Sequence, residues 1–281
     1  MSAEKGVPLA VVDRDEMSAV DDGAEGAKLE AATAERQLPG RVRLMGAHLI
    51  EGPNGLAHAR SEDLRALYGL LAENRRTLVT RTHAQDRLWP GVQLSPDRFP
   101  NLLKDARARL CEALGRATGD GKYVLQNIAT NGYRLNPGLF TCDVWEFRDL
   151  LGEASMAGPG EKEAKLAAAV ELYTGPYLAE LPHPWAQAAS RGVAKEVVRA
   201  LSQLAAAEPD RERALAHLER ATGIEKTAEH LYRSRMQLYA ELGRTTDVHH
   251  CFDELSEVLK ARSAKPDRQT IGLYRQLSGD Q

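Results

Sequence analysis

The residues best suited to chemistry in this 281-residue chain gather at helical spacing in its first half. At about 100° per residue, Asn101 and Lys104 fall near the centre of one helix face, and Arg98, Arg107 and Arg109 lie along its borders. Asparagine can bond adenine in bidentate fashion, and lysine can reach guanine or phosphate. Arginines at the borders would bind phosphates, which adds affinity and register but no sequence choice. These residues therefore predict a helix that reads the major groove of DNA.

Other residues on the same face argue both for and against contact with DNA. Ala108 has no bulk to hold the backbone away from a groove, whereas Asp97 and Asp105 would be repelled by phosphates. An aspartate fits there only if it accepts from cytosine N4 or pairs with a neighbouring arginine. The alternative for this stretch alone is a solvated surface helix.

Capping signals place this helix in the stretch 95–115. Ser95 is a natural N-cap, Pro96 suits the first helical position, and Gly115 suits the residue after the last turn. The face opposite Asn101 is apolar and is predicted to be buried. Its members are Phe99, Leu102, Leu103, Ala106, Leu110, Ala113 and Leu114.

Neighbouring segments supply further candidate contacts. Thr80 and Arg81 stand at the start of another predicted helix, where backbone N–H groups also attract phosphate. Lys122, Asn131 and Arg134 are candidates on a predicted hairpin. For Asn131 an alternative stays open, because a type I′ turn requires an Asn-Gly pair without any ligand.

The order of the predicted elements indicates what positions these residues. Alternating apolar residues and turn chemistry predict strands, and caps with apolar periodicity predict helices. The elements are a small antiparallel sheet over 41–57, a helix from Ser61, a helix from Thr80 or Thr82 to Pro90, the helix 96–114, a strand over 122–129, a turn at 130–132 and a strand over 133–135. This is the order of a winged helix-turn-helix, whose third helix reads DNA while its hairpin touches the backbone.

Short motifs in these elements resemble a known family. They are Leu78-Val79-Thr80-Arg81, Leu88-Trp89-Pro90, Asn101-Leu102-Leu103, Arg109-Leu110, Leu114-Gly115 and Asn131-Gly132-Tyr133-Arg134-Leu135. In this order and spacing they resemble the OmpR-type DNA-binding domain, and more narrowly the version in SARP-type actinobacterial transcription regulators. The resemblance implies a winged helix that binds DNA.

The second half of the chain is similar to the domain that follows the winged helix in the same regulators. The motifs are Asp143-Val144-Trp145-Glu146-Phe147, Leu172-Tyr173, Gly175-Pro176-Tyr177-Leu178, Leu181-Pro182 and Trp185. They resemble the bacterial transcriptional activator domain, so the resemblance spans about 42–278.

Helical periodicity continues to the end of the chain. Segments 185–207, 211–222, 227–242 and 246–261 carry apolar residues at helical spacing, and 271–277 would cap the array. Paired helices with short links are the logic of tetratricopeptide repeats, which offer concave surfaces for partners or self-association. The predicted fold class is mainly α with a small β component, a winged helix-turn-helix followed by a TPR-like helical array.

No segment carries a convincing catalytic or metal motif. Gly119-Asp120-Gly121-Lys122 lacks the leading glycine and the Ser or Thr of a phosphate loop. His249-His250 beside Cys251 lacks a second ligand pair, and His183 has no recognisable Ser or Cys partner. We therefore expect no enzyme activity, cofactor or metal.

Charge and cysteine content complete the expectations. Residues 41–140 hold 15 basic and 9 acidic side chains, between acidic segments 1–40 and 141–281. This basic middle favours an anionic partner there. The scattered Cys111, Cys142 and Cys251, with no signal peptide or membrane span, indicate the cytoplasm.

The sequence therefore predicts three parts: a flexible acidic tail over 1–40, a winged helix over 41–140 and an activator-type helical domain over 141–281. The predicted function is a DNA-binding transcriptional regulator, an activator by resemblance, with RNA polymerase and a second copy of the chain as further partners. The alternative is a protein-interaction or ligand-sensing module whose winged helix no longer binds DNA. The operator and any small-molecule effector are not specified.

Overall fold

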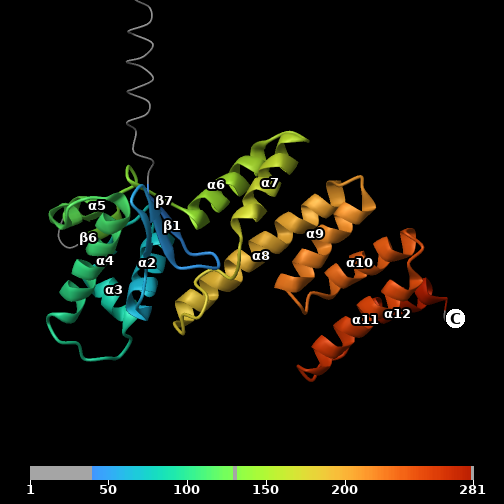
Figure 1. Cartoon of the computed structure of the whole chain (residues 1–281). Helices are drawn as coiled ribbons and strands as arrows, with labels where there is room; N and C mark the ends of the chain where they lie inside the picture. Colours follow the sequence, from blue (N-terminus) through green and yellow to red (C-terminus); the bar gives the residue numbers. More distant parts are fainter. Residues whose placement is uncertain (1–39, 129–131, 280–281) are drawn as a thin grey trace, which may run out of the picture. The chain divides into compact units, whose positions relative to one another are not determined.

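A computed structural model describes residues 40–128 and 132–279, which belong to one compact unit (Figure 1). The tail predicted over 1–40 lies outside the described residues except for Gly40, as do Thr130 and Asn131 of the predicted turn. The observed fold is mainly helical, with two small sheets.

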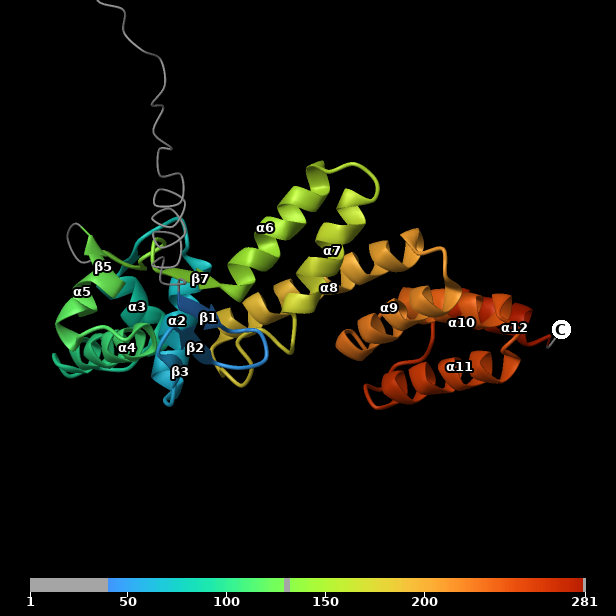
Figure 2. The same cartoon turned by 45° about the horizontal axis from the view of Figure 1, so that its top comes forward.

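The N-terminal sheet has the strand order β3-β2-β1-β7 (Figure 2). β1 (Gly40–Arg43), β2 (Leu49–Gly52) and β3 (Gly55–His58) form the predicted antiparallel part. The antiparallel sheet predicted over 41–57 is therefore confirmed, and β7 (Phe140–Cys142), which the sequence did not indicate, adds a fourth strand parallel to β1. This pairing joins segments about a hundred residues apart, which local turn chemistry cannot indicate.

Three helices follow the first strands. Ser61 caps α2 (Glu62–Glu73) and Thr80 caps α3 (Arg81–Leu88), each by accepting a backbone N–H. α4 (Arg98–Leu114) ends at Gly115 in the left-handed conformation, as expected of a terminating glycine. Both termini of α3 and the C-terminus of α4 therefore lie close to their predicted positions.

The start of α4 differs from the prediction. Ser95 is not its N-cap and Pro96 is not its first residue, because the chain first makes a turn in which Arg98 N–H donates to the Ser95 carbonyl. The first i to i+4 bond runs from Asn101 N–H to the Asp97 carbonyl, and the Asp97 side chain makes no capping bond. The helix predicted over 96–114 therefore covers 98–114.

The hairpin also begins later than predicted. After η1 (Thr118–Asp120), Lys122 lies in the short helix α5 (Gly121–Val124), and the strand β5 covers only Leu125–Ile128. Burial of Gly121 and Val124, three residues apart, gives α5 one side to pack on α4. β6 (Gly132–Leu135) pairs with β5 and with β4 (Val79–Thr80) in the order β4-β6-β5.

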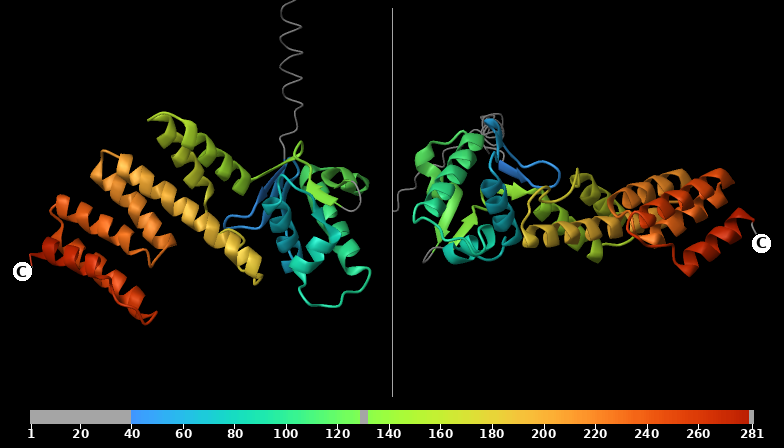
Figure 3. Two further views of the ribbon diagram at one scale, coloured as in Figure 1. Left: turned by 180° about the vertical axis from the view of Figure 1, so that it is seen from behind. Right: turned by 90° about the horizontal axis from the view of Figure 1, so that it is seen from below.

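The rest of the chain is a helical array. Its members are α6 (Asp143–Met156), α7 (Glu161–Leu172), α8 (Pro184–Ala207), α9 (Arg211–Ile224), α10 (Glu229–Glu241), α11 (Thr245–Lys260) and α12 (Arg268–Ser278). Figure 3 shows α8 to α12 as successive neighbours from two sides. The TPR-like prediction is confirmed, with helix ends shifted by at most three residues.

The activator-type segment touches the winged helix through a loop and a buried carboxylate. The loop before α8 forms a bridge between Tyr177 and Met45, and Leu178 N–H donates to the Leu44 carbonyl at 3.0 Å. At the start of α6, Asp143 Oδ2 accepts the N–H groups of Leu44 and Met45, each at 2.8 Å. The end of β1 is therefore fixed by residues about a hundred positions later.

Candidate nucleic-acid interface

The predicted reading helix has the expected two faces. Its apolar face is buried: Phe99, Leu102, Leu103, Ala106, Leu110, Cys111, Ala113 and Leu114. On the opposite face, the side chains of Asn101, Lys104, Asp97 and Asp105 are exposed. Burial of one face fixes the helix on the domain, so the same four polar residues are always presented to solvent.

Three candidate side chains are free to bind a ligand. The side chains of Asn101 and Lys104 on α4 and of Lys122 on α5 are exposed and make no hydrogen bond or ion pair with the residues that the structure describes. A lysine held by no carboxylate keeps its whole charge for a phosphate or a base. Asn101 and Lys104 lie three residues apart, hence on one side of the helix.

Arg98 has a structural role at the start of α4. Its guanidinium lies 4.5 Å from the ring centroid of Trp89 and its Nη2 lies 3.3 Å from Asp63 Oδ2. Asp63 also accepts the indole N–H of Trp89 at 2.9 Å. Asp63, in the first turn of α2, therefore binds both Trp89 at the end of α3 and Arg98 at the start of α4.

Arg107 and Arg109 are also engaged. The Arg107 guanidinium is half-buried and donates from Nε and Nη2 to the Leu125 carbonyl, at 3.4 and 3.3 Å. Burial lowers the pKa of Arg107. Arg109 pairs with Glu112 on the same helix at 2.7 Å, and its side chain is only 28% exposed. Both guanidinium groups therefore have protein partners that compete with the phosphate binding predicted for them.

The candidates at the start of α3 and on the hairpin have partners too. Thr80 is an exposed cap, and the Arg81 Nη2 donates to the Pro96 carbonyl at 3.1 Å, which links α3 to the turn before α4. Arg134 donates from Nε to Gln126 across the hairpin at 2.9 Å. Asn131 lies outside the described residues.

Asn54 and Asp63 position the reading helix but were missed from the sequence. Asn54, in the β2–β3 turn, bonds to the last turn of α4, and Asp63 holds Arg98 and Trp89. Asp63 has a local signal, since an acidic residue in the first turn of a helix is favoured by the helix dipole. Asn54 has no such signal, because a turn between two strands does not indicate a partner on α4.

The histidines considered for catalysis have packing partners. His183 is buried, with Nε2 3.0 Å from the Leu88 carbonyl, and His249 Nδ1 lies 2.8 Å from the Tyr274 hydroxyl. Within 40–128 and 132–279 there is no cluster of three or more His, Cys, Asp or Glu side chains fit to hold a metal ion. Over the same ranges, no helix combines the length and apolarity needed to cross a bilayer.

Comparison with known proteins gives the second half of the chain its family. Residues 142–278 match the family described as the bacterial transcriptional activator domain. No curated protein matches the chain.

A solved structure supports the fold of both halves. The fold is similar to that of Mycobacterium tuberculosis EmbR, solved in complex with a low affinity phosphopeptide, with a TM-score of 0.64 and 21% identity. The match covers 86% of this chain and 66% of the EmbR chain, so this chain spans slightly less than two thirds of that structure. With a bacterial transcriptional activator domain behind a winged helix, the chain has the domain architecture of a SARP-type transcription regulator.

Proposed function

We propose that this chain binds double-stranded DNA, with α4 in the major groove and the β5–β6 hairpin on the adjacent backbone. The observation that carries the proposal is the exposure of Asn101 and Lys104, without partners among the described residues, on the third helix of a winged helix. The helix behind them is fixed by its buried face, so binding must order the two side chains but not the backbone that carries them. The boundaries 41–140 for this domain and 141–281 for the activator-type domain are part of the proposal.

The candidate residues then divide by what each can still offer. Asn101 and Lys104 reach base edges, and Lys122 contacts phosphate from beside the wing. Arg81, Arg98 and Arg134 keep N–H donors beyond those already used, because a guanidinium carries five. They can bind phosphate without giving up their structural bonds, and Arg107 and Arg109 have smaller parts than the sequence predicted.

The two aspartates on the same face favour particular sequences. A carboxylate accepts from cytosine N4 and is repelled by phosphates, so Asp105, one residue from Lys104, would restrict which base pairs α4 accepts. Asp97 lies just before α4, and its negative charge is repelled by DNA phosphates, which weakens non-specific binding. We therefore expect a site-selective protein with modest affinity for random DNA.

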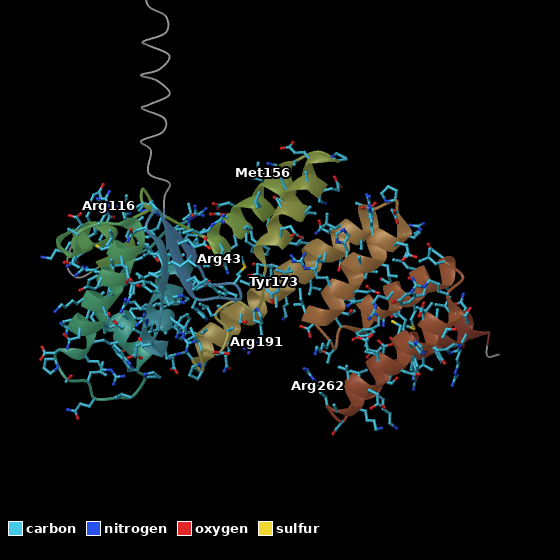
Figure 4. All side chains as sticks on the ribbon, viewed as in Figure 1. Arg43, Arg116, Met156, Tyr173, Arg191 and Arg262 are labelled. Carbon is cyan, nitrogen blue, oxygen red and sulfur yellow. The ribbon has the colours of Figure 1, made fainter. Side chains whose placement is uncertain are left out.

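Selection of bound sequences from random duplex DNA by the purified chain tests the proposal. A repeated motif is expected, and Asn101→Ala should relax the preference at one base pair by about 1–3 kcal/mol. Lys104→Ala should reduce affinity and, if it binds phosphate, lower the salt slope by about 0.9. Arg262→Ala, an exposed cation after the end of α11 (Figure 4), is the matched control and should change neither.

The alternative is a winged helix that no longer binds DNA and serves protein or ligand contacts. The exposed, unpaired Asp97 and Asp105 are the observation in its favour. A titration with duplex DNA at low salt separates the two functions, because a DNA-binding winged helix retains non-specific affinity there. No binding at low salt would contradict the main proposal.

An activator role, contact with RNA polymerase, a homodimer on paired sites and a cytoplasmic location belong to the same proposal. The activator role is supported by the description of the family that residues 142–278 match. Transcription in vitro from a promoter that carries the selected motif, with and without the chain, measures activation directly. Sedimentation of the chain with one-site and two-site duplexes measures whether two copies bind together.

A further inference from the structure

The last turn of α3 is capped by side chains of the helical array. The Arg87 carbonyl accepts the indole N–H of Trp185 at 3.1 Å, and the Leu88 carbonyl lies 3.0 Å from His183 Nε2. Because a carbonyl oxygen can only accept, His183 carries its proton on Nε2. Two side chains at the start of α8 therefore bind the end of the helix that precedes the reading helix α4.

The course of the chain after α3 explains why these carbonyls are open to α8. The last carbonyls of a helix lack the N–H groups that would follow four residues on. Pro90 has no N–H, and Gly91 turns the chain in the left-handed conformation. The Val92 N–H, which would bond to Leu88 in a longer helix, donates to the Trp89 carbonyl at 3.2 Å instead. The array thus supplies donors that the chain beyond α3 does not.

Backbone restriction and packing hold the two donors in place. Buried His183 stands between Pro182 and Pro184, and a residue before proline is restricted to extended backbone, in agreement with its ψ of 128°. Trp185, in the first turn of α8, packs on α2, where a Cβ at Gly69 would lie 3.4 Å from the indole ring. Both donors are therefore directed at α3 by structure that does not depend on α3.

The end of α3 is linked directly to the start of α4. Trp89 follows α3 and donates its indole N–H to Asp63, while the guanidinium of Arg98 lies over the Trp89 ring. Arg98 is the first residue of α4 and precedes Asn101 by less than one turn. The buried face of α4 determines which side chains point outward, and these contacts determine where its N-terminal end lies.

We infer that His183 and Trp185 are positioning residues for DNA reading. They hold the end of α3, and through Trp89 the start of α4, in the orientation that presents Asn101 and Lys104 to the major groove. The inference rests on the proposed DNA binding, and it makes the affinity of the winged helix for DNA dependent on the first turn of α8.

Hydrogen exchange of the full-length chain without DNA tests the positioning. His183→Ala and Trp185→Phe each remove one donor, so exchange over residues 86–101 should rise about fivefold, the effect of losing one hydrogen bond. In His183→Gln the side-chain amide can donate to the same carbonyl, and exchange should stay within about twofold of wild type. Trp185→Phe keeps a ring against α2, so it carries the test if His183→Ala does not fold.

The matched control is His48→Ala. His48 Nε2 donates to the Ala179 carbonyl at 3.1 Å, a bond of the same kind between the winged helix and the array that does not involve α3. Its loss should leave exchange over 86–101 unchanged, whatever its effect on the free energy of unfolding. Unchanged exchange in His183→Ala and Trp185→Phe, or an equal rise in His48→Ala, would overturn the inference.

The second measurement uses a duplex that carries the motif selected by the wild-type chain. His183→Ala and Trp185→Phe should bind it about fivefold more weakly, and His183→Gln and His48→Ala should bind within about twofold of wild type. The salt slope should not change, because no phosphate contact is removed. Wild-type affinity in both donor-less variants would overturn the inference even if their exchange is raised. If the wild-type chain binds no DNA, the proposed function fails, and the exchange results still decide whether the two residues position α4.

Discussion

The side-chain amide of Asn54 donates to the backbone carbonyl of Glu112 at 3.0 Å. The backbone N–H of Asn54 also donates to the Ala113 carbonyl at 3.0 Å. Both carbonyls belong to the last turn of α4, where the chain supplies no N–H four residues on, and the Glu112 carbonyl also accepts the Gly115 N–H at 3.2 Å. The β2–β3 turn thus caps the C-terminus of the reading helix, and the N-terminal sheet fixes the orientation of that helix.

Gly52 makes this cap possible, and Gly52→Ala should break it. A Cβ at this position would lie 2.3 Å from the Ala113 carbonyl oxygen, a backbone atom that cannot rotate away. We expect a loss of at least about 2 kcal/mol in the free energy of unfolding, measured by urea denaturation. Gly119→Ala is the control, because nothing lies within 4 Å of its Cβ position. Equal stability of the two variants would contradict the capping role.

Asp143→Asn should weaken the attachment of the helical array to the winged helix and lower the free energy of unfolding. Asp143 Oδ2 accepts from Leu44 and Met45, and Oδ1 accepts the Val144 N–H at 2.8 Å. An amide presents a donor at one of these positions, so at least one buried N–H loses its acceptor. The expected loss is about 1–3 kcal/mol. Asp149→Asn, at an exposed carboxylate paired with Arg75, should cost less than about 1 kcal/mol in the same assay.

The sequence predicted the faces of α4 and the element order because both depend on local spacing. Apolar residues three or four apart define a buried face whatever the rest of the chain does. The partners of the arginines depend on distant residues and could not be predicted. Asp63 lies 35 residues before Arg98, and Leu125 lies 18 residues after Arg107.

Two predicted boundaries were wrong, for different reasons. Ser95 has the residue type of an N-cap, yet the chain turns once more before α4 begins at Arg98. Lys122 lies in α5 and not in a strand, because Gly121 and Val124 pack on α4. At Lys122 packing against α4 overrides a local strand preference, whereas the turn at Ser95 is held by hydrogen bonds, from Arg98 N–H to the Ser95 carbonyl and from Arg81 to the Pro96 carbonyl.

Arg107→Ala should affect the wing more than DNA binding. The substitution removes both donors to the Leu125 carbonyl, so hydrogen exchange at β5 and β6 should increase and the free energy of unfolding should fall by about 1 kcal/mol. The salt slope of DNA binding should stay near the wild-type value. Lys104→Ala should have the opposite effects: the free energy of unfolding should stay unchanged, and the affinity for DNA should fall. If Arg107→Ala lowers the salt dependence of DNA binding and leaves hydrogen exchange at β5 and β6 unchanged, Arg107 binds a DNA phosphate and does not stabilise the hairpin.

Alkaline pH should weaken the C-terminal helices through Tyr232. This side chain is fully buried, and its hydroxyl donates to Glu254 at 3.3 Å. Burial, with the charge of Glu254 adding to it, raises the pKa of Tyr232 from 10.0 to about 12. The folded state therefore holds the proton more tightly than the unfolded state. The stabilisation is complete below pH 10 and is lost as the pH rises through about 12.

Comparison of wild type with Tyr232→Phe isolates this contribution. Between about pH 10 and 12 the wild type should lose up to about 1.4 kcal/mol per pH unit more than the variant, which has no proton to release. At neutral pH the variant should be less stable by about 1 kcal/mol, because it lacks the bond to Glu254. Urea unfolding followed by circular dichroism at several alkaline pH values measures both differences. Tyr123→Phe, at a ring that is 55% exposed, should follow the wild-type pH dependence, and the same behaviour in Tyr232→Phe would show that Tyr232 does not control it.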